Sequence, residues 1–94
     1  MTHITQAMLV NAISAQDDEF VTHDIVRFLY TNYQHEYLRE LNANASAKYP
    51  FTETHRQLGQ ALAKLTHLVR KVNKVQSGKT MRGKATLVQK WRKV

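Results

Sequence analysis

The stretch that decides the fold is Thr54-His55-Arg56-Gln57-Leu58-Gly59-Gln60-Ala61-Leu62-Ala63-Lys64-Leu65. Its apolar residues recur at spacings of three and four, and the repeat continues to Val72, which predicts one amphipathic helix over residues 54–72. Thr54 and Gln57 have the form of a capping box, so the helix is expected to begin at Thr54.

This predicted helix divides into two faces. The apolar face is expected to lie in the core and consists of Leu58, Ala61, Leu62, Leu65, Leu68, Val69 and Val72. The opposite face is polar, basic and small, and consists of Arg56, Gln60, Ala63, His67, Lys71 and Lys74, with Gly59 and Lys64 beside it.

The segment that follows changes to a period of two. Alternation from Ala85 to Lys93, with Gly78 and Gly83 at the ends of the connection, predicts a two-stranded β-hairpin. Trp91 is expected to pack on the preceding helix or to close the core. The tip of the hairpin, residues 78–84, would hold three basic side chains: Lys79, Arg82 and Lys84.

Toward the N-terminus, a first helix is predicted over residues 4–16, capped by Thr2 or Thr5. It should stop before Asp17-Asp18-Glu19, because these carboxylates oppose the negative end of the helix dipole. Phe20-Val21 follows as a short extended piece that can form a minimal strand.

A second helix is expected to begin with Thr22 as its N-cap. Its apolar pattern either continues to about Leu41 or is broken into two helices at Asn32. Residues 42–47 are small and polar and are expected to form a loop. Tyr49-Pro50 should stay extended, because a residue before proline avoids the helical region.

Length and composition indicate one domain over residues 1–94. The fold class is therefore α+β and mostly helical, with three or four helices followed by the C-terminal hairpin. The chain has no cysteine, which excludes disulfides and thiolate chemistry. It has no apolar run long enough to cross a bilayer and no secretory signal, so we expect an intracellular, cytoplasmic protein.

The charge is divided unevenly along the chain. Residues 1–50 carry three basic and six acidic side chains, whereas residues 51–94 carry eleven basic side chains and the single carboxylate of Glu53, a net charge of +10. A segment of this kind favours a polyanionic partner, most simply nucleic acid.

The order of helix, short extended piece, two helices and basic hairpin resembles the winged helix-turn-helix superfamily of DNA-binding domains. The most specific stretches are residues 54–65, Gly78 with Arg82-Gly83-Lys84, and Trp91-Arg92, similar to a recognition helix and wing of phage, plasmid and bacterial regulators. One departure is the connection between Tyr33 and Thr52, which is longer than the turn of a compact helix-turn-helix.

The resemblance implies sequence-specific binding of double-stranded DNA by a small regulator of transcription or replication, acting on the nucleoid or in a phage-infected cell. The helix over residues 54–72 would enter the major groove, and residues 78–84 would contact the backbone or the minor groove. Arg56 could donate two hydrogen bonds to guanine, and Gln57 or Gln60 could pair with adenine. The basic residues along the helix would contact phosphates. The predicted DNA-binding residues are Thr54, His55, Arg56, Gln57, Gln60, Lys64, Lys71, Lys74, Lys79, Arg82 and Lys84.

The row Tyr30, Tyr33 and Tyr37 has two interpretations. It either covers the core or forms an exposed surface for a homodimer, since many prokaryotic DNA-binding proteins pair on symmetric sites.

Two other functions compete with duplex binding. The main alternative is a protein-interaction module whose basic C-terminal half binds an acidic protein partner. Single-stranded RNA binding is disfavoured, because all the aromatic residues except Trp91 precede Thr52.

The sequence predicts neither enzymatic activity nor a bound metal. The five histidines form no pair at a spacing of four, so no metal site is predicted. Gly78-Lys79-Thr80 resembles the end of a phosphate-binding loop, but Asn73 stands where that motif needs a glycine. We therefore expect no cofactor and no small-molecule substrate.

Overall fold

The computed structural model describes residues 2–72, 75–76 and 87–94. This part of the chain is a small α+β domain with four helices and a three-stranded antiparallel sheet. The helices are α1 (Gln6–Ser14), α2 (Thr22–Asn32), α3 (Gln34–Ala43) and α4 (Pro50–Ala63). The strands are β1 (Glu19–Val21), β2 (Val69–Lys71), β3 (Val75–Gln76), β4 (Leu87–Val88) and β5 (Lys90–Lys93).

β5 is the central strand of the sheet, which has the order β1-β5-β2. Trp91 on β5 lies opposite Phe20 on β1 and opposite Lys71 on β2, and β3 and β4 form a separate antiparallel pair. The minimal strand expected at Phe20-Val21 is thus confirmed. The predicted connection of the C-terminal hairpin, residues 78–83, lies outside the described residues, so the wing stays a prediction. The prediction did not include β1, which pairs with the second edge of β5.

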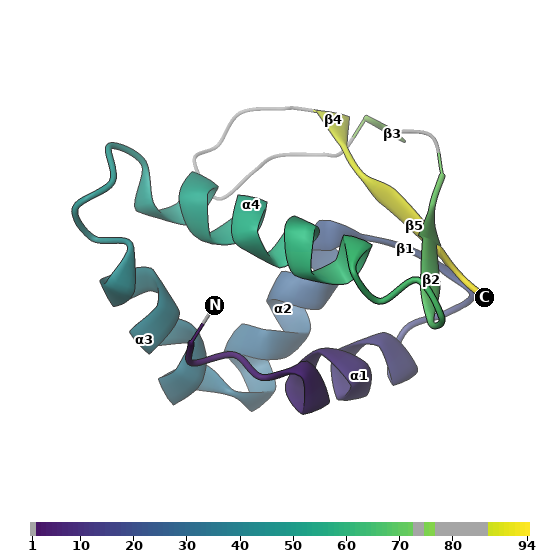
Figure 1. Cartoon of the computed structure of the whole chain (residues 1–94), viewed down its shortest axis with the longest axis horizontal. Coiled ribbons are helices and arrows are strands. Elements are labelled where there is room, and N and C mark those ends of the chain that lie inside the picture. Colours follow the sequence, from purple (N-terminus) through teal and green to yellow (C-terminus); the bar gives the residue numbers. More distant parts are fainter. Residues whose placement is uncertain (1, 73–74, 77–86) are drawn as a thin grey trace.

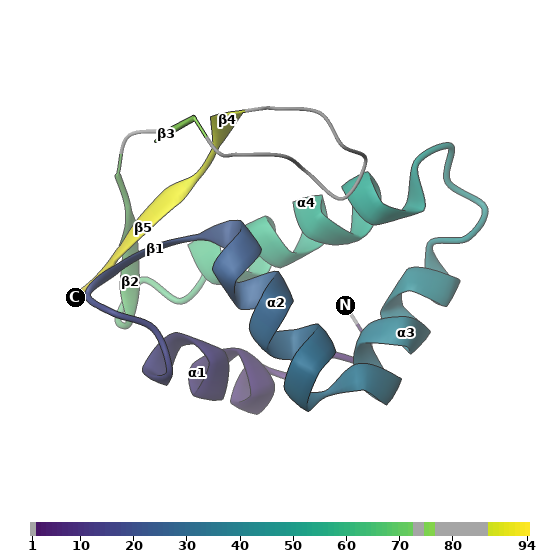
Figure 2. The ribbon, with the colours of Figure 1, turned by 180° about the vertical axis from the view of Figure 1, so that it is seen from behind.

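The sheet lies at one end of the molecule and the loop between α3 and α4 lies at the other (Figure 1). Figure 2 shows the reverse view, in which α4 and α1 are again on opposite sides with α2 between them. In both views β3 and β4 lie on the same side as α4.

The first helix is shorter than predicted. It covers Gln6–Ser14, and Thr5 caps it by accepting a hydrogen bond from the Met8 amide at 3.3 Å. Ile4 precedes the helix but is buried all the same. The amides of His3 and Ile4 donate to Glu40 Oε1 at 2.6 and 2.9 Å, which fastens the start of the chain to α3.

The second helical segment is broken in two, as one of the two alternatives predicted. The break falls at Tyr33, one residue after Asn32, where the backbone leaves the helical region (φ −133°, ψ 54°). Thr22 is not the N-cap, because Val21 occupies that position. The Thr22 hydroxyl instead accepts a hydrogen bond from Trp91 Nε1 at 2.9 Å, and Asp24 accepts from the Val21 amide at 3.0 Å.

The start of α4 corrects the prediction for this helix. It begins at Pro50 instead of Thr54. Proline suits the first helical position, because its fixed φ matches the helix and its missing N–H would have no partner there. Thr54 lies inside the helix with none of its surface exposed, so it caps nothing.

The end of α4 corrects the prediction again, because the helix stops at Ala63 and does not reach residue 72. The Leu65 amide donates to Leu62 O at 3.0 Å, a tight turn that ends the helix. Val69 then begins β2, which pairs with β5. The apolar repeat continues through this change because the core needs apolar side chains from either kind of element.

A single core joins all four helices to the sheet. Its buried apolar residues are Ile4, Leu9, Ala12, Ile13, Phe20, Ile25, Val26, Leu29, Tyr37, Leu58, Leu62, Leu65, Val69 and Trp91. Trp91 is 1% exposed, which confirms that it closes the core.

Candidate nucleic-acid interface

The outer face of α4 is the strongest candidate for a binding surface. The helix buries Thr54, Leu58 and Leu62, and its opposite side is open to solvent. Residues at a spacing of four line that side: Thr52, Arg56, Gln60 and Lys64. We call these four residues the outer face of α4. Its side chains are polar or cationic, a composition that suits contacts with bases and phosphates.

Arg56 is the central cation of this face, and it is paired with Glu53. Arg56 Nε donates to Glu53 Oε2 at 2.8 Å, and Arg56 Nη2 donates to Glu53 Oε1 at 2.5 Å. The hydrogen bonds from Arg56 lower the pKa of the Glu53 carboxyl, so Glu53 is ionised at neutral pH. The same pairing raises the pKa of Arg56. Sequence reasoning did not include Glu53 in the site, although its i, i+3 spacing from Arg56 was a usable signal.

Gln57 faces the loop between α3 and α4, away from the outer face. Its Nε2 donates to Asn44 Oδ1 at 3.1 Å, and Asn44 Nδ2 donates to Thr54 Oγ1 at 2.9 Å. Two predicted DNA contacts, Thr54 and Gln57, are therefore held in hydrogen bonds inside the protein. Asn44 was not predicted, because it is thirteen residues from Gln57 and no local pattern links them.

His55 also points inward, toward the aromatic side chains between α2, α3 and α4. A hydrogen bond joins His55 Nε2 to the Tyr37 hydroxyl at 3.0 Å, and the His23 ring lies 6.1 Å away between centroids. Burial, with a smaller effect of His23, lowers the pKa of His55 to about 4. His55 is therefore neutral at pH 7 and adds no positive charge to the outer face.

The tyrosine row does not form one exposed surface. Tyr37 is a core residue, and burial raises its pKa to about 12. Tyr33 is half-buried and its hydroxyl accepts a hydrogen bond from Asn11 at 2.8 Å, whereas Tyr30 is 40% exposed. Tyr37 lies in the core, as the first interpretation predicted. Because Tyr37 is buried, the three rings together do not form the exposed surface that the homodimer interpretation requires.

The other predicted basic contacts are divided between two elements. Lys64 is the C-cap residue of α4, and Lys71 is on β2 instead of the helix; both are exposed. Exposed Arg70 precedes Lys71 on β2. The remaining predicted contacts lie outside the described residues: Lys74, Lys79, Arg82 and Lys84.

Gly59 lies beside the outer face, in the middle of α4. Apart from its own helix, no atom of the described residues lies within 4 Å of a Cβ atom added at this position. Packing among these residues therefore does not require a glycine here.

A second cluster of charges lies on the sheet. Arg92 on β5 donates from Nε to Glu19 Oε2 at 2.8 Å and also from Nη2, and Lys90 Nζ lies 2.9 Å from Glu19 Oε1. Hydrogen bonds from Lys90 and then Arg92 lower the pKa of Glu19. Arg70 on β2 lies opposite Arg92. The ion pairs of this cluster join β1 to β5.

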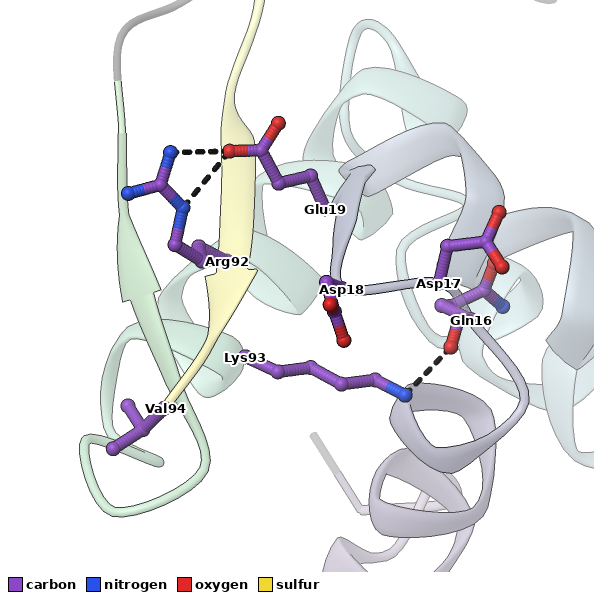
Figure 3. Close-up of a pocket in the computed structure, with 7 residues that line it drawn as sticks. All are labelled: Gln16, Asp17, Asp18, Glu19, Arg92, Lys93 and Val94. Atoms are coloured by element: carbon purple, nitrogen blue, oxygen red, sulfur yellow. Dashed lines mark hydrogen bonds and ion pairs between the residues drawn. The ribbon is translucent and has the colours of Figure 1, made fainter.

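An open depression lies where the end of β5 meets the turn after α1 (Figure 3). Asp17 and Asp18 line it, together with the Glu19–Arg92 pair. Lys93 Nζ donates to Gln16 O at 2.5 Å across the depression, and this bond ties the C-terminal strand to the end of α1. The Lys93–Gln16 hydrogen bond and the Glu19–Arg92 pair thus hold the C-terminal strand against the segment that follows α1.

In the part of the chain that the structure describes, no helix is both long enough and apolar enough to cross a membrane. Within the same residues, no three or more histidine, aspartate or glutamate side chains come together as metal ligands.

The chain was compared with models of protein families, with curated proteins and with solved structures. None of the three comparisons gives a match. The functional interpretation therefore depends on the outer face of α4 and its neighbours.

Proposed function

We propose that this protein binds double-stranded DNA in a sequence-specific manner and regulates transcription or replication. In this proposal the outer face of α4 enters the major groove, and residues 78–84 contact the backbone or the minor groove as a wing. The observation that carries the proposal is the outer face of α4, which presents Arg56, Gln60 and Lys64 to solvent.

The topology gives further support. A helix, a short strand, further helices and two antiparallel C-terminal segments follow one another in the order expected of a winged helix-turn-helix domain. The long connection between the second helix and the recognition helix holds α3, which packs against both α2 and α4. This extra helix therefore occupies the connection where the sequence had indicated a departure from the compact motif, and it packs against α4.

Charge also supports a polyanionic partner. The described basic residues after α4 include exposed Arg70 and Lys71, and residues 54–94 hold no carboxylate side chain. Glu53, the nearest acid, is neutralised by Arg56. Exposed cations that are unpaired attract phosphate more strongly than cations that carry their own counter-ion.

The test is fluorescence anisotropy of a labelled random duplex and a matching single strand, titrated across salt concentrations. We expect the duplex to bind more tightly, with a log–log slope of about −0.9 for each phosphate contacted. Lys64→Ala should weaken binding to all duplexes. It should also make the log–log slope less steep by about 0.9, the contribution of one phosphate contact. Arg39→Ala is the matched control, because Arg39 is an exposed cation on α3 and lies outside the outer face.

Two results would contradict the proposal. One is equal affinity for duplex and single strand, and the other is equal loss of duplex affinity in Lys64→Ala and Arg39→Ala. Absence of duplex binding combined with capture of an acidic protein would instead favour the interaction module.

A further inference from the structure

The ion pair on α4 uses only one edge of the Arg56 guanidinium. This group has five N–H donors arranged on a plane. Glu53 accepts from Nε and from Nη2, which together form the side edge of the group. The end edge, formed by Nη1 and the second hydrogen of Nη2, points away from the ion pair. Among the described residues, none accepts a hydrogen bond from Nη1, and the Arg56 side chain is 54% exposed.

The Glu53 carboxylate is itself held from the interior. Gln57 Nε2 donates to Glu53 Oε1 over a long 3.5 Å, and its other bond goes to Asn44 Oδ1 at 3.1 Å. Asn44 Nδ2 in turn donates to Thr54 Oγ1 at 2.9 Å and to Glu40 O at 3.1 Å. A continuous series of hydrogen bonds thus links a fully buried threonine to an exposed arginine.

This arrangement has two physical consequences for a ligand. A side chain whose rotamers are already restricted loses less conformational entropy when it binds, so the contact is more selective for geometry. The charge of Arg56 is also balanced by Glu53, which reduces its attraction to phosphate at any sequence. Both effects favour hydrogen bonding of Arg56 to a planar pair of acceptors over its electrostatic attraction to the phosphates of the DNA backbone.

The chemical group that fits the open edge is guanine. In the major groove, guanine O6 and N7 form an acceptor pair that matches two parallel N–H donors of arginine. Adenine offers one acceptor and one donor at the same place, so it accepts only one of the two bonds.

We propose that Glu53 is a positioning residue that holds Arg56 with its end edge toward the major groove, where Arg56 reads a single guanine. The inference rests on the proposed function, since it requires that α4 enters the groove. It assigns Glu53 a role in specificity even though its negative charge opposes DNA binding.

The experiment begins with selection of preferred sites from a random duplex library by the wild-type protein. Anisotropy then measures affinity for the selected duplex, for the same duplex with each base pair changed, and for a random duplex. The variants are Arg56→Ala, which removes the donors to the base, Arg56→Lys, which keeps the charge but lacks the planar fork, and Glu53→Gln, which removes the counter-ion. Arg39→Ala is the control, since Arg39 is exposed on α3, outside the outer face of α4.

For the wild type we expect a preference for guanine at one position of roughly 5- to 100-fold. Arg56→Ala should lose this preference, and Arg56→Lys should show a smaller preference while it keeps its affinity for random duplex. Glu53→Gln should bind random duplex more tightly and yet discriminate less at the same position. A purely structural role for Glu53 would not move these two quantities in opposite directions. Arg39→Ala should keep the preference for guanine at that position.

The outcomes separate the inference from the function on which it rests. Failure of the wild type to bind any duplex would overturn both. Duplex binding with the guanine preference intact in Arg56→Ala would overturn the assignment of the base to Arg56. A preference that is unchanged in Glu53→Gln, in a protein that unfolds at the wild-type temperature, would overturn the positioning role.

Discussion

The two faces of α4 carry out different tasks with neighbouring residues. On the inner face, Thr54, Leu58 and Leu62 have none of their surface exposed, and packing determines their positions. On the outer face, Arg56 is held by its pair with Glu53, and the remaining side chains extend into solvent. The difference teaches that stability and binding should be separable in this helix by substitutions only one or two residues apart.

The largest expected effect is on the inner face. Leu58→Ala removes a fully buried side chain and leaves a cavity, so the free energy of unfolding should fall by roughly 2–5 kcal/mol. Urea denaturation measures this change. Gln60→Ala, two residues away on the outer face, is the control and should change the same quantity by no more than about 0.5 kcal/mol. Equal losses in the two variants would show that the faces are not distinct.

The next effect comes from His55, which belongs to the inner side despite its polar side chain. Its pKa is lowered to about 4 in the folded protein, mainly by burial, and lies near 6.5 in the unfolded chain. Between these values the unfolded state binds more protons, so stability is complete above pH 6.5 and is lost as the pH falls toward 4. The loss from this group should be on the order of 2 kcal/mol at pH 4.

The measurement for His55 is urea denaturation of the wild type and of His55→Gln between pH 7 and pH 4. The variant cannot take up the proton, so its stability should fall less steeply over this range. Parallel curves for the two proteins would mean that His55 titrates normally and is not shielded by Tyr37 and its other neighbours.

The smallest effect is expected at the boundary between the faces. Gly59→Ala should raise the free energy of unfolding by about 0.5–1 kcal/mol, because alanine loses less backbone entropy than glycine in a helix. Among the described residues outside its own helix, the added methyl group would meet no atom within 4 Å. Thermal unfolding measures the change, and a lower midpoint than that of the wild type would place Gly59 against a neighbouring group instead.

Sequence reasoning located the elements better than the site. The helical period predicted that Leu58 and Leu62 face the core, and both are fully buried. It could not show that Thr54 is buried, because a threonine before an apolar repeat is typical of an N-cap as well as of a helix interior. Nor could it find Asn44, whose contacts with α4 depend on how the loop after α3 folds back.

The sequence by itself determined which residues of α4 are apolar, how its faces divide and that the C-terminal half is basic. These properties depend on spacings of a few residues and on composition. Only the tertiary structure decided where α4 ends, that β5 joins β1 to β2, and that Arg56 is held by Glu53 while His55 and Gln57 turn inward. The physical reason is range: Glu19 and Arg92 are 73 residues apart, and pairing over such a distance leaves no local pattern in the chain.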